Sequence, residues 1–221
     1  MIIFISDILD ADTLSSLRDA ASGLEFEPGA ATAGWHARQV KANAQAAPSA
    51  TLRQIQRQVI DALRRHEVFR AAVQPARLAP PLISRYGPGE GYGWHVDDAV
   101  LHDPPLRSDL SVTLFLSGPE SYAGGELVLQ AADGDETIKL KAGSAVVYPS
   151  TYLHQVSEVT SGERLAAVTW VQSLVRSVED RAILFELEQA RRAEYDRTGK
   201  SPDFDRLARI HANLLRRWAE L

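Results

Sequence analysis

The segment Trp94-His95-Val96-Asp97 contains the residues whose chemistry is easiest to interpret. In a β-strand, side chains two residues apart point to the same face, so His95 and Asp97 are predicted to project together. A further histidine, His154, lies far enough along the chain for antiparallel strands to return it beside this pair. Two imidazoles and one carboxylate on one face of a metal leave other coordination positions open. This donor set suits non-haem Fe(II) with a chelating co-substrate and O₂.

Each of these residues also has an ordinary structural explanation. Taken alone, a His-x-Asp pair is commonly a surface pair or a turn cap, because aspartate side chains readily cap turns. A single histidine such as His154 is commonly a hydrogen-bonded structural residue. His102 lies beside Asp103 in a polar loop, where we expect it on the substrate side or in solvent. No chemistry is assigned to the three remaining histidines, His36, His66 and His211.

Arg164 is the residue best suited to hold an anionic co-substrate. It is predicted at the start of the last strand, from which its side chain can reach the inside of a barrel. Arginine binds a carboxylate through two parallel charge-assisted hydrogen bonds, and a dicarboxylic co-substrate needs such an anchor at the end far from the metal. Tyr86, just before the GPGEG loop, could donate to the same carboxylate from its hydroxyl. The alternatives are a solvated arginine at a strand end and a tyrosine that only packs.

Short apolar and β-branched runs, separated by Gly, Pro and Asp, dominate the middle of the chain. This pattern is typical of an antiparallel sandwich, jelly roll or barrel. The dipeptide Asp133-Gly134 marks a hairpin between two of the runs. The predicted strands are Leu82–Tyr86, Gly93–Asp97, Leu110–Leu116, Glu126–Gln130, Thr137–Leu140, Ala145–Tyr148, His154–Val159 and Leu165–Val171.

The N-terminal part of the chain is predicted to combine one strand with two helices. Ile2–Ile5 is expected to form a short strand, and Asp10 or Asp12 to cap the helix that follows it. A second helix begins at Thr51, where apolar residues recur at helical spacing. Between the two helices, residues 29–50 are polar and rich in alanine, and they show no clear periodicity.

Two amphipathic helices, Val178–Arg192 and Phe204–Leu221, are predicted at the C-terminus. We divide the chain into residues 1–176, with the β core at about 80–172, and a small helical domain at 177–221. The predicted fold class is therefore mainly β with flanking helices. An apolar face on the first C-terminal helix favours a homodimer; this face contains Ile183, Leu184 and Leu187.

The composition narrows the classes of function. The 221 residues include no cysteine, which excludes disulfides, iron–sulfur clusters, Cys-ligated zinc and thiolate nucleophiles. The formal net charge of −5 gives no electrostatic footprint for nucleic acid. No run approaches the roughly 18 apolar residues of a membrane span, and the N-terminus lacks the basic region of a signal peptide. We therefore expect a cytoplasmic protein that binds neither nucleic acid nor membranes.

Several longer stretches resemble the Fe(II)- and 2-oxoglutarate-dependent dioxygenases, specifically the bacterial PKHD-type hydroxylases (the PiuC/YbiX group). The match runs nearly from end to end. Upstream, Val40-Lys41 with Asn43 and Gln45 is similar to the family's Lys/Asn/Gln stretch, although Ala42 stands where members often carry another asparagine. The matching stretches are Tyr86–Asp97 (YGPGEGYGWHVD), Asp109–Ser117 (DLSVTLFLS), Tyr122–Leu127 (YAGGEL), Gly143–His154 (GSAVVYPSTYLH) and Gly162–Arg176 (GERLAAVTWVQSLVR).

The resemblance implies a double-stranded β-helix (jelly-roll) core with a defined set of site residues. His95, Asp97 and His154 become the iron ligands, and Arg164 becomes the anchor for 2-oxoglutarate. The implied reaction hydroxylates a substrate while 2-oxoglutarate is decarboxylated to succinate and CO₂, with ascorbate as a candidate reductant. Some members of the family lie beside siderophore uptake systems, which suggests a role in iron uptake or homeostasis.

The substrate and two other functions stay open. A small molecule or a peptide is compatible with the sequence, and the loop at residues 98–107 is expected to shape access to the site. A cupin-like metalloenzyme could use the same three ligands with Zn or Mn. A sensor could bind iron and 2-oxoglutarate without turnover.

Overall fold

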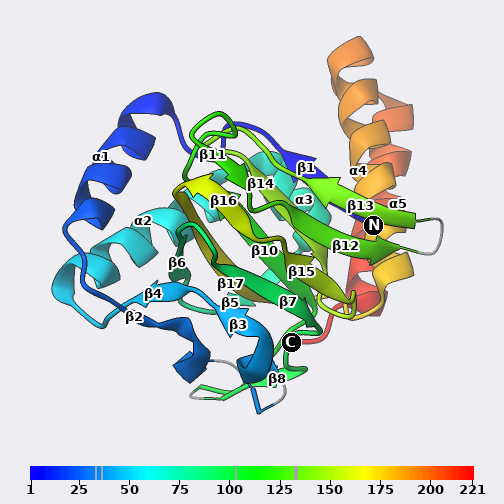
Figure 1. Cartoon of the computed structure of the whole chain (residues 1–221). Helices are drawn as coiled ribbons and strands as arrows, with labels where there is room; N and C mark the ends of the chain where they lie inside the picture. The colour runs from blue at the N-terminus through cyan, green and yellow to red at the C-terminus, as the bar shows by residue number, and fades with distance from the viewer. Residues whose placement is uncertain (33, 36, 103, 132–133) are drawn as a thin grey trace.

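Two facing β-sheets form the centre of the molecule (Figure 1). The computed structural model describes residues 1–32, 34–35, 37–102, 104–131 and 134–221. His36, Asp103 and the Asp133 of the predicted hairpin lie outside the described residues. The mainly β fold class with flanking helices is confirmed.

The larger sheet joins strands that are far apart in the sequence. At its centre, β10 (Leu110–Phe115) pairs antiparallel along its whole length with β17 (Arg164–Ser173). The β5 strand (Pro75–Leu78) also pairs with β17. The order of the strands other than β5 is β1 (Ile3–Ile5), β14 (Ala145–Pro149), β10, β17, β6 (Leu82–Tyr86), β4 (Ala44–Ala46) and β2 (Phe26–Pro28).

The smaller sheet lies across from the larger one and is also antiparallel. Its order is β13 (Gly134–Ile138), β12 (Leu127–Ala131), β15 (His154–Val156), β7 (Gly91–His95) and β3 (Lys41–Ala42). Four short strands form two further pairs, β11 (Tyr122–Gly124) with β16 (Val159–Gly162) and β8 (Val100–Leu101) with β9 (Leu106–Arg107). Two 3₁₀ turns, η1 (Gly29–Thr32) and η2 (Ala37–Val40), precede β3.

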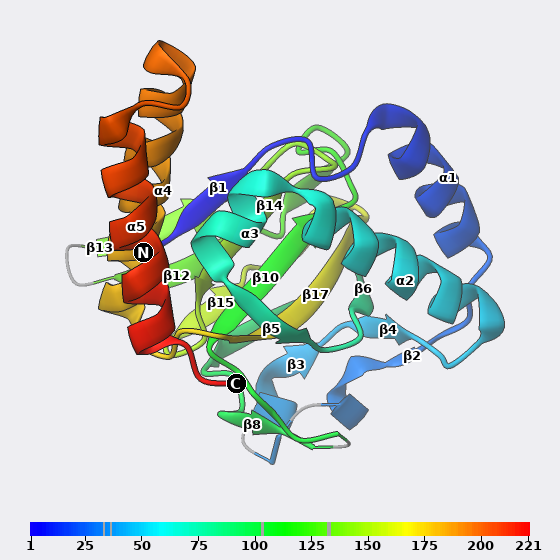
Figure 2. The same ribbon diagram turned by 180° about the vertical axis from the view of Figure 1, so that it is seen from behind.

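The helices α1 (Ala11–Ser22), α2 (Ala50–Arg65) and α3 (Glu67–Val73) pack on the outer face of the larger sheet (Figure 2). Their apolar faces share one hydrophobic core with the buried residues of β10, β14 and β17. The side chain of Asp10 accepts a hydrogen bond from a backbone N–H of α1, as one of the two predicted caps. Ser49 caps α2, which therefore begins one residue before the predicted Thr51.

The helices α4 (Val178–Thr198) and α5 (Pro202–Trp218) form the C-terminal pair and pack beside α3 (Figure 2). Leu184 is fully buried within its own chain, whereas Ile183 is 47% exposed. Leu184, part of the apolar face predicted for a homodimer, is therefore already packed inside its own chain. None of the described helices is both long and apolar enough to cross a membrane.

The predictions for two strands need correction, and one stretch without a prediction contains strands. The predicted strand Gly93–Asp97 ends at His95, so Asp97 lies in the loop that follows β7. The predicted strand His154–Val159 separates into β15 and β16, which belong to different sheets. Residues 29–50, for which the sequence predicts no element, contain β3, which pairs with β7 at the edge of the smaller sheet, and β4, which lies between β6 and β2 in the larger one.

Candidate metal centre and co-substrate cavity

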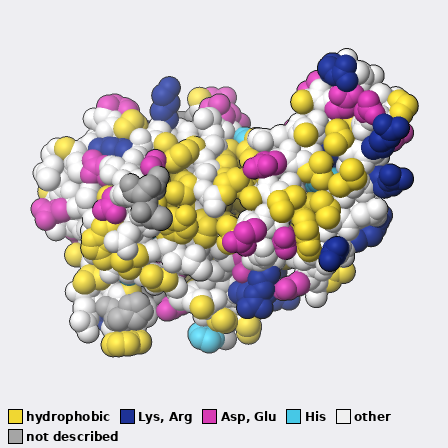
Figure 3. Space-filling view, turned by 90° about the vertical axis from the view of Figure 1, so that its right-hand side faces the viewer, with side chains coloured by type: hydrophobic (Ala, Val, Ile, Leu, Met, Phe, Trp, Pro, Cys, Tyr) yellow, Lys and Arg dark blue, Asp and Glu magenta, His cyan; other side chains and the backbone are white. Residues whose placement is uncertain are grey.

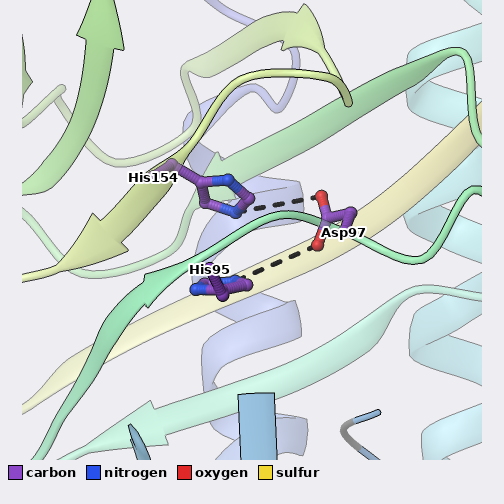
Figure 4. Close-up of side chains that lie close together, drawn as sticks. All are labelled: His95, Asp97 and His154. Carbon is purple, nitrogen blue, oxygen red and sulfur yellow. Dashed lines mark ion pairs between the residues drawn. The ribbon is translucent and has the colours of Figure 1, made fainter. Parts of the chain in front are cut away.

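The neighbouring strands β7 and β15 bring two histidines together (Figure 4). His95 is directly opposite His154 in the antiparallel register, and their ring centroids are 4.1 Å apart. The Asp97 carboxylate faces both rings, with Oδ1 4.0 Å from His95 Nε2 and Oδ2 3.8 Å from His154 Nε2. One ligand atom from each residue lies within 4.8 Å of the other two. This cluster of three residues can hold one metal ion.

Backbone carbonyls set the tautomers of both histidines. His95 Nδ1 is 2.8 Å from the carbonyl oxygen of Gly93, and His154 Nδ1 is 3.0 Å from that of Tyr152. Because a carbonyl can only accept, each Nδ1 carries the hydrogen and each Nε2 is left with a free lone pair. Both Nε2 atoms face Asp97, as metal binding requires. Metal-ligating histidines are usually oriented by such a second contact.

Asp97 follows the end of β7 and is oriented by a contact from the opposite sheet. Ser111 of β10 donates from its hydroxyl to Asp97 Oδ2 at 2.5 Å. The Ser111 oxygen is 2.8 Å from the hydroxyl of Ser150, and since Ser111 uses its one hydrogen for Asp97, Ser150 is the donor there. Among the described residues, Asp97 Oδ1 accepts no hydrogen bond and is free to bind a metal.

Burial keeps the His95 imidazole neutral. Desolvation, and then the nearby His154, lower the pKa of His95 to about 4. A metal ligand must be deprotonated, so at neutral pH His95 is ready to bind without releasing a proton. Tyr92 stacks on one face of His95, with the ring centroids 3.5 Å apart, and shields it from water.

A cavity between the two sheets extends from this cluster to Arg164. Arg164 begins β17 and is only 1% exposed, with its guanidinium 5.0 Å from the Tyr86 ring centroid and 5.5 Å from that of Phe115. Its Nε and Nη1 atoms have no hydrogen-bond partner within the part of the chain that the structure describes. A buried charge without a counterion is costly. The donors present therefore fit a metal ion together with a carboxylate co-substrate.

Two tyrosines extend the polar lining of the cavity. Tyr86 is paired with Arg164 in the register of β6 and β17, and burial raises the pKa of its hydroxyl. The hydroxyl therefore keeps its hydrogen at neutral pH and can donate it. Tyr148 of β14 meets the His154 ring edge-on at 5.3 Å. It lies in a fully apolar run, so the sequence indicates only a core position for Tyr148.

Glycine is needed at two positions beside Arg164. Gly124 and Gly125 have φ values of 71° and 66°, in the left-handed region that side chains rarely adopt. A Cβ atom on Gly125 would lie 3.0 Å from Arg164 Cδ, and one on Gly124 would lie 2.0 Å from the backbone oxygen of Glu158. Gly125 therefore makes room for the buried arginine, and Gly124 allows the close approach of the Glu158 backbone.

The loop after Asp97 forms part of the mouth of the cavity. Asp98 and Leu101, both from the loop expected to shape access, line the cavity. His102 is exposed to solvent. Ser111 and Ser150 are not predictable as functional residues, because isolated serines have no diagnostic spacing. Their one signal is that both lie inside stretches that resemble the hydroxylases.

Residues 81–172, which hold these side chains, match the family model of the 2OG-Fe(II) oxygenase superfamily. The fold is similar to that of a Pseudomonas putida prolyl-4-hydroxylase, with a TM-score of 0.52 and 21% identity over 78% of this chain and 92% of that one. A Trichoplax adhaerens prolyl hydroxylase gives a TM-score of 0.55 with 15% identity, over 82% and 86% of the two chains. The protein is an Fe(II)- and 2-oxoglutarate-dependent oxygenase with a jelly-roll core.

The C-terminal pair and the full-length relatives narrow this class. Residues 179–220 match the model of the PKHD-type hydroxylase C-terminal domain. A PKHD-type hydroxylase of Acaryochloris marina is 49% identical over 221 residues, and one of Gloeothece citriformis is 46% identical over 220 residues. Both matches cover 100% of each chain. The chain belongs to the PKHD-type hydroxylase family.

Proposed function

We propose that His95, Asp97 and His154 bind Fe(II), and that the enzyme hydroxylates a small-molecule or peptide substrate while 2-oxoglutarate and O₂ yield succinate and CO₂. The observation that carries the proposal is the buried His–Asp–His cluster with both Nε2 lone pairs free. Two imidazoles and a carboxylate on one side of a metal are the donor set of non-haem Fe(II) oxygenases. When bound, iron and 2-oxoglutarate supply the oxidising chemistry.

The protein's own contribution is binding, orientation and exclusion of water. Arg164 binds the distal carboxylate of 2-oxoglutarate through charge-assisted hydrogen bonds, which its unpaired Nε and Nη1 support. The Tyr86 hydroxyl adds a neutral donor to the same carboxylate. Ser111 holds Asp97 so that Oδ1 faces the metal. Apolar residues such as Leu127 line the cavity and keep water from the reacting groups.

Further features of the proposal rest on the resemblance, for ascorbate and iron homeostasis, and on the sequence pattern, for the location, the partners and the domains. Ascorbate serves as the reductant that keeps the iron ferrous, and the enzyme acts in iron uptake or homeostasis in the cytoplasm. It has no nucleic-acid or membrane partner and forms a homodimer through the C-terminal helices. The oxygenase domain spans residues 1–176 and the helical domain 177–221; the two family models, at 81–172 and 179–220, support a boundary between them.

The test is 2-oxoglutarate turnover by the purified protein. Succinate and CO₂ are measured with Fe(II), 2-oxoglutarate and O₂, and then with Zn(II) or Mn(II) in place of iron. We expect turnover only with iron, and its loss in His95→Ala and Asp97→Ala. His211→Gln, which removes a histidine on α5 outside the cavity, is the matched control and should retain turnover.

Each alternative function has its own outcome. Full turnover in His95→Ala or Asp97→Ala would show that the substituted residue does not bind the metal. Reaction with Zn(II) or Mn(II) and no succinate would favour a cupin-like enzyme. Tight binding of iron and 2-oxoglutarate without any succinate release would favour a sensor.

A further inference from the structure

Residues 41–46 connect the edges of the two sheets at the mouth of the cavity. β3 pairs with β7 at the edge of the smaller sheet, and β4 pairs with β6 near the edge of the larger one. Figure 1 shows β3 and β4 crossing this side of the molecule. Lys41 and Gln45, one from each strand, both line the cavity.

The Lys41 ammonium is held in place by neutral groups. Its Nζ donates to Thr32 Oγ1 at 3.0 Å and lies 5.1 Å from the ring centroid of Tyr92. Thr32 Oγ1 is 2.5 Å from Gln45 Oε1, to which it can donate its hydrogen while it accepts from Lys41. Among the described residues, no carboxylate oxygen lies within 4.0 Å of Lys41 Nζ, so Lys41 forms no ion pair with them. Desolvation lowers the pKa of Lys41 to about 8, and the charge of Asp97 opposes this shift.

Once the site is loaded, the charges of the cavity leave Lys41 and Asp98 unassigned, and no ion pair joins these two residues. The described charged residues of the lining are Lys41, Asp97, Asp98 and Arg164. Under the proposed function, the metal neutralises Asp97 and the distal carboxylate of 2-oxoglutarate neutralises Arg164. Asp98 lies against the backbone of Gly34, where an added Cβ would be 3.0 Å from its Oδ1. A half-buried ammonium in this position is best satisfied by an anion from outside the chain.

The cavity also has a hydrogen-bond donor, unpaired among the described residues, at the end opposite to Arg164. Trp170 lines it six positions after Arg164 on β17, roughly 20 Å along the strand at 3.3 Å per residue. The Trp170 Nε1–H is buried and has no hydrogen-bond partner among the described atoms. The register of β10 and β17 places Trp170 opposite Ser111, which binds Asp97, so this donor lies on the metal side of the cavity, away from the co-substrate anchor, and is available to a substrate.

We propose that Lys41, supported by Thr32 and Gln45, binds a carboxylate group of the substrate at the mouth of the cavity. This inference rests on the proposed function, because it assigns Asp97 and Arg164 to the metal and the co-substrate. A singly charged group is favoured because one ammonium balances one negative charge.

The test measures binding of neutral and acidic probes to protein whose co-substrate site is already filled. The protein is loaded with Zn(II) and saturating 2-oxoglutarate, and this loading is measured first by calorimetry. A panel of N-acetyl amino acids and the matching N-acetyl amino acid amides is then titrated by the same method. The variants are Lys41→Gln and Lys41→Arg, with Lys200→Gln as a control that removes an exposed lysine far along the chain in the α4–α5 connection.

We expect the acids of the panel to bind more tightly than their amides. Lys41→Gln should lower the affinity for the acids by about tenfold. Lys41→Arg should retain most of the preference, and Lys200→Gln should behave as wild type. All variants should bind 2-oxoglutarate with unchanged affinity. Equal binding of acids and amides, binding of no acid, or an unchanged acid affinity in Lys41→Gln would overturn the inference. A loss of 2-oxoglutarate affinity in Lys41→Gln would overturn it too, by placing Lys41 in the co-substrate site.

The two proposals fail in different ways. If the protein does not bind Zn(II) and 2-oxoglutarate, the proposed function fails at the loading step. If loading succeeds but Lys41→Gln leaves acid binding intact, only the role of Lys41 fails.

Discussion

Ser111→Ala is predicted to weaken metal binding while the fold is retained. The Ser111 side chain is fully buried and donates to Asp97 Oδ2 at 2.5 Å, across the gap between the two sheets. A hydrogen bond to a charged group contributes about 1.5–3 kcal/mol. Without it, Asp97 lies in a loop with no donor to hold its carboxylate toward the two histidines. We expect metal affinity to fall by about 10- to 100-fold, as is common when such supporting contacts are lost.

The assay is calorimetric titration of metal-free protein with Co(II), an air-stable substitute for Fe(II), together with urea unfolding in the same buffer. Ser117→Ala is the matched control, because Ser117 is a buried serine that follows the same strand and accepts from the backbone N–H of Leu165 at 2.8 Å. Both variants should lose about 1–2 kcal/mol of unfolding free energy. Only Ser111→Ala should lose metal affinity.

Two results would refute this reasoning. Wild-type Co(II) affinity in Ser111→Ala would show that Asp97 needs no donor from β10. An equal loss of affinity in Ser111→Ala and Ser117→Ala would show that affinity follows general stability. Ser150→Ala should have a smaller effect, because Ser150 reaches Asp97 only through Ser111.

Three further predictions concern the co-substrate anchor, its glycine support and pH. Arg164→Lys should weaken 2-oxoglutarate binding by about tenfold or more with metal affinity unchanged, since lysine lacks the planar fork; calorimetry with Zn(II) tests this. Gly125→Ala should lower the free energy of unfolding by about 1–3 kcal/mol and also weaken the binding of 2-oxoglutarate, because its Cβ would lie 3.0 Å from Arg164 Cδ. Wild-type stability and wild-type 2-oxoglutarate affinity would contradict this contact. The pKa of His95 is lowered from 6.5 to about 4, so the unfolded chain binds more protons between these values. Urea unfolding of metal-free protein should therefore show the free energy of unfolding falling as pH drops through this range, by about 3 kcal/mol, with a smaller slope in His95→Gln. An equal slope in both proteins would show that His95 is not the cause.

The sequence predicts the central strands well because their patterns are local. The bounds predicted for Leu82–Tyr86 are those of β6, and the predicted strand Leu110–Leu116 exceeds β10 by one residue. Both are apolar runs between turn residues, and burial on the sheet preserves that pattern. His95 and His154 come together because they lie on such strands.

The features that escape prediction depend on contacts between distant segments. β3 and β4 contain only two and three residues, too few for a period, and they are strands because the edges of β7 and β6 offer partners. The direction of the Asp97 side chain is likewise set by Ser111 from another sheet. The carboxylate reaches the histidines as predicted, but the strand alternation offered as the reason does not apply.

The central claim is that one metal is held by His95, Asp97 and His154 with 2-oxoglutarate anchored at Arg164. A crystal structure of the protein loaded anaerobically with Fe(II) and 2-oxoglutarate tests it most directly. We predict iron bound by His95 Nε2, His154 Nε2 and Asp97 Oδ1, with the distal carboxylate of 2-oxoglutarate on the Arg164 guanidinium and Lys41 still free. Iron bound elsewhere, or a distal carboxylate held by Lys41 instead of Arg164, would contradict the account.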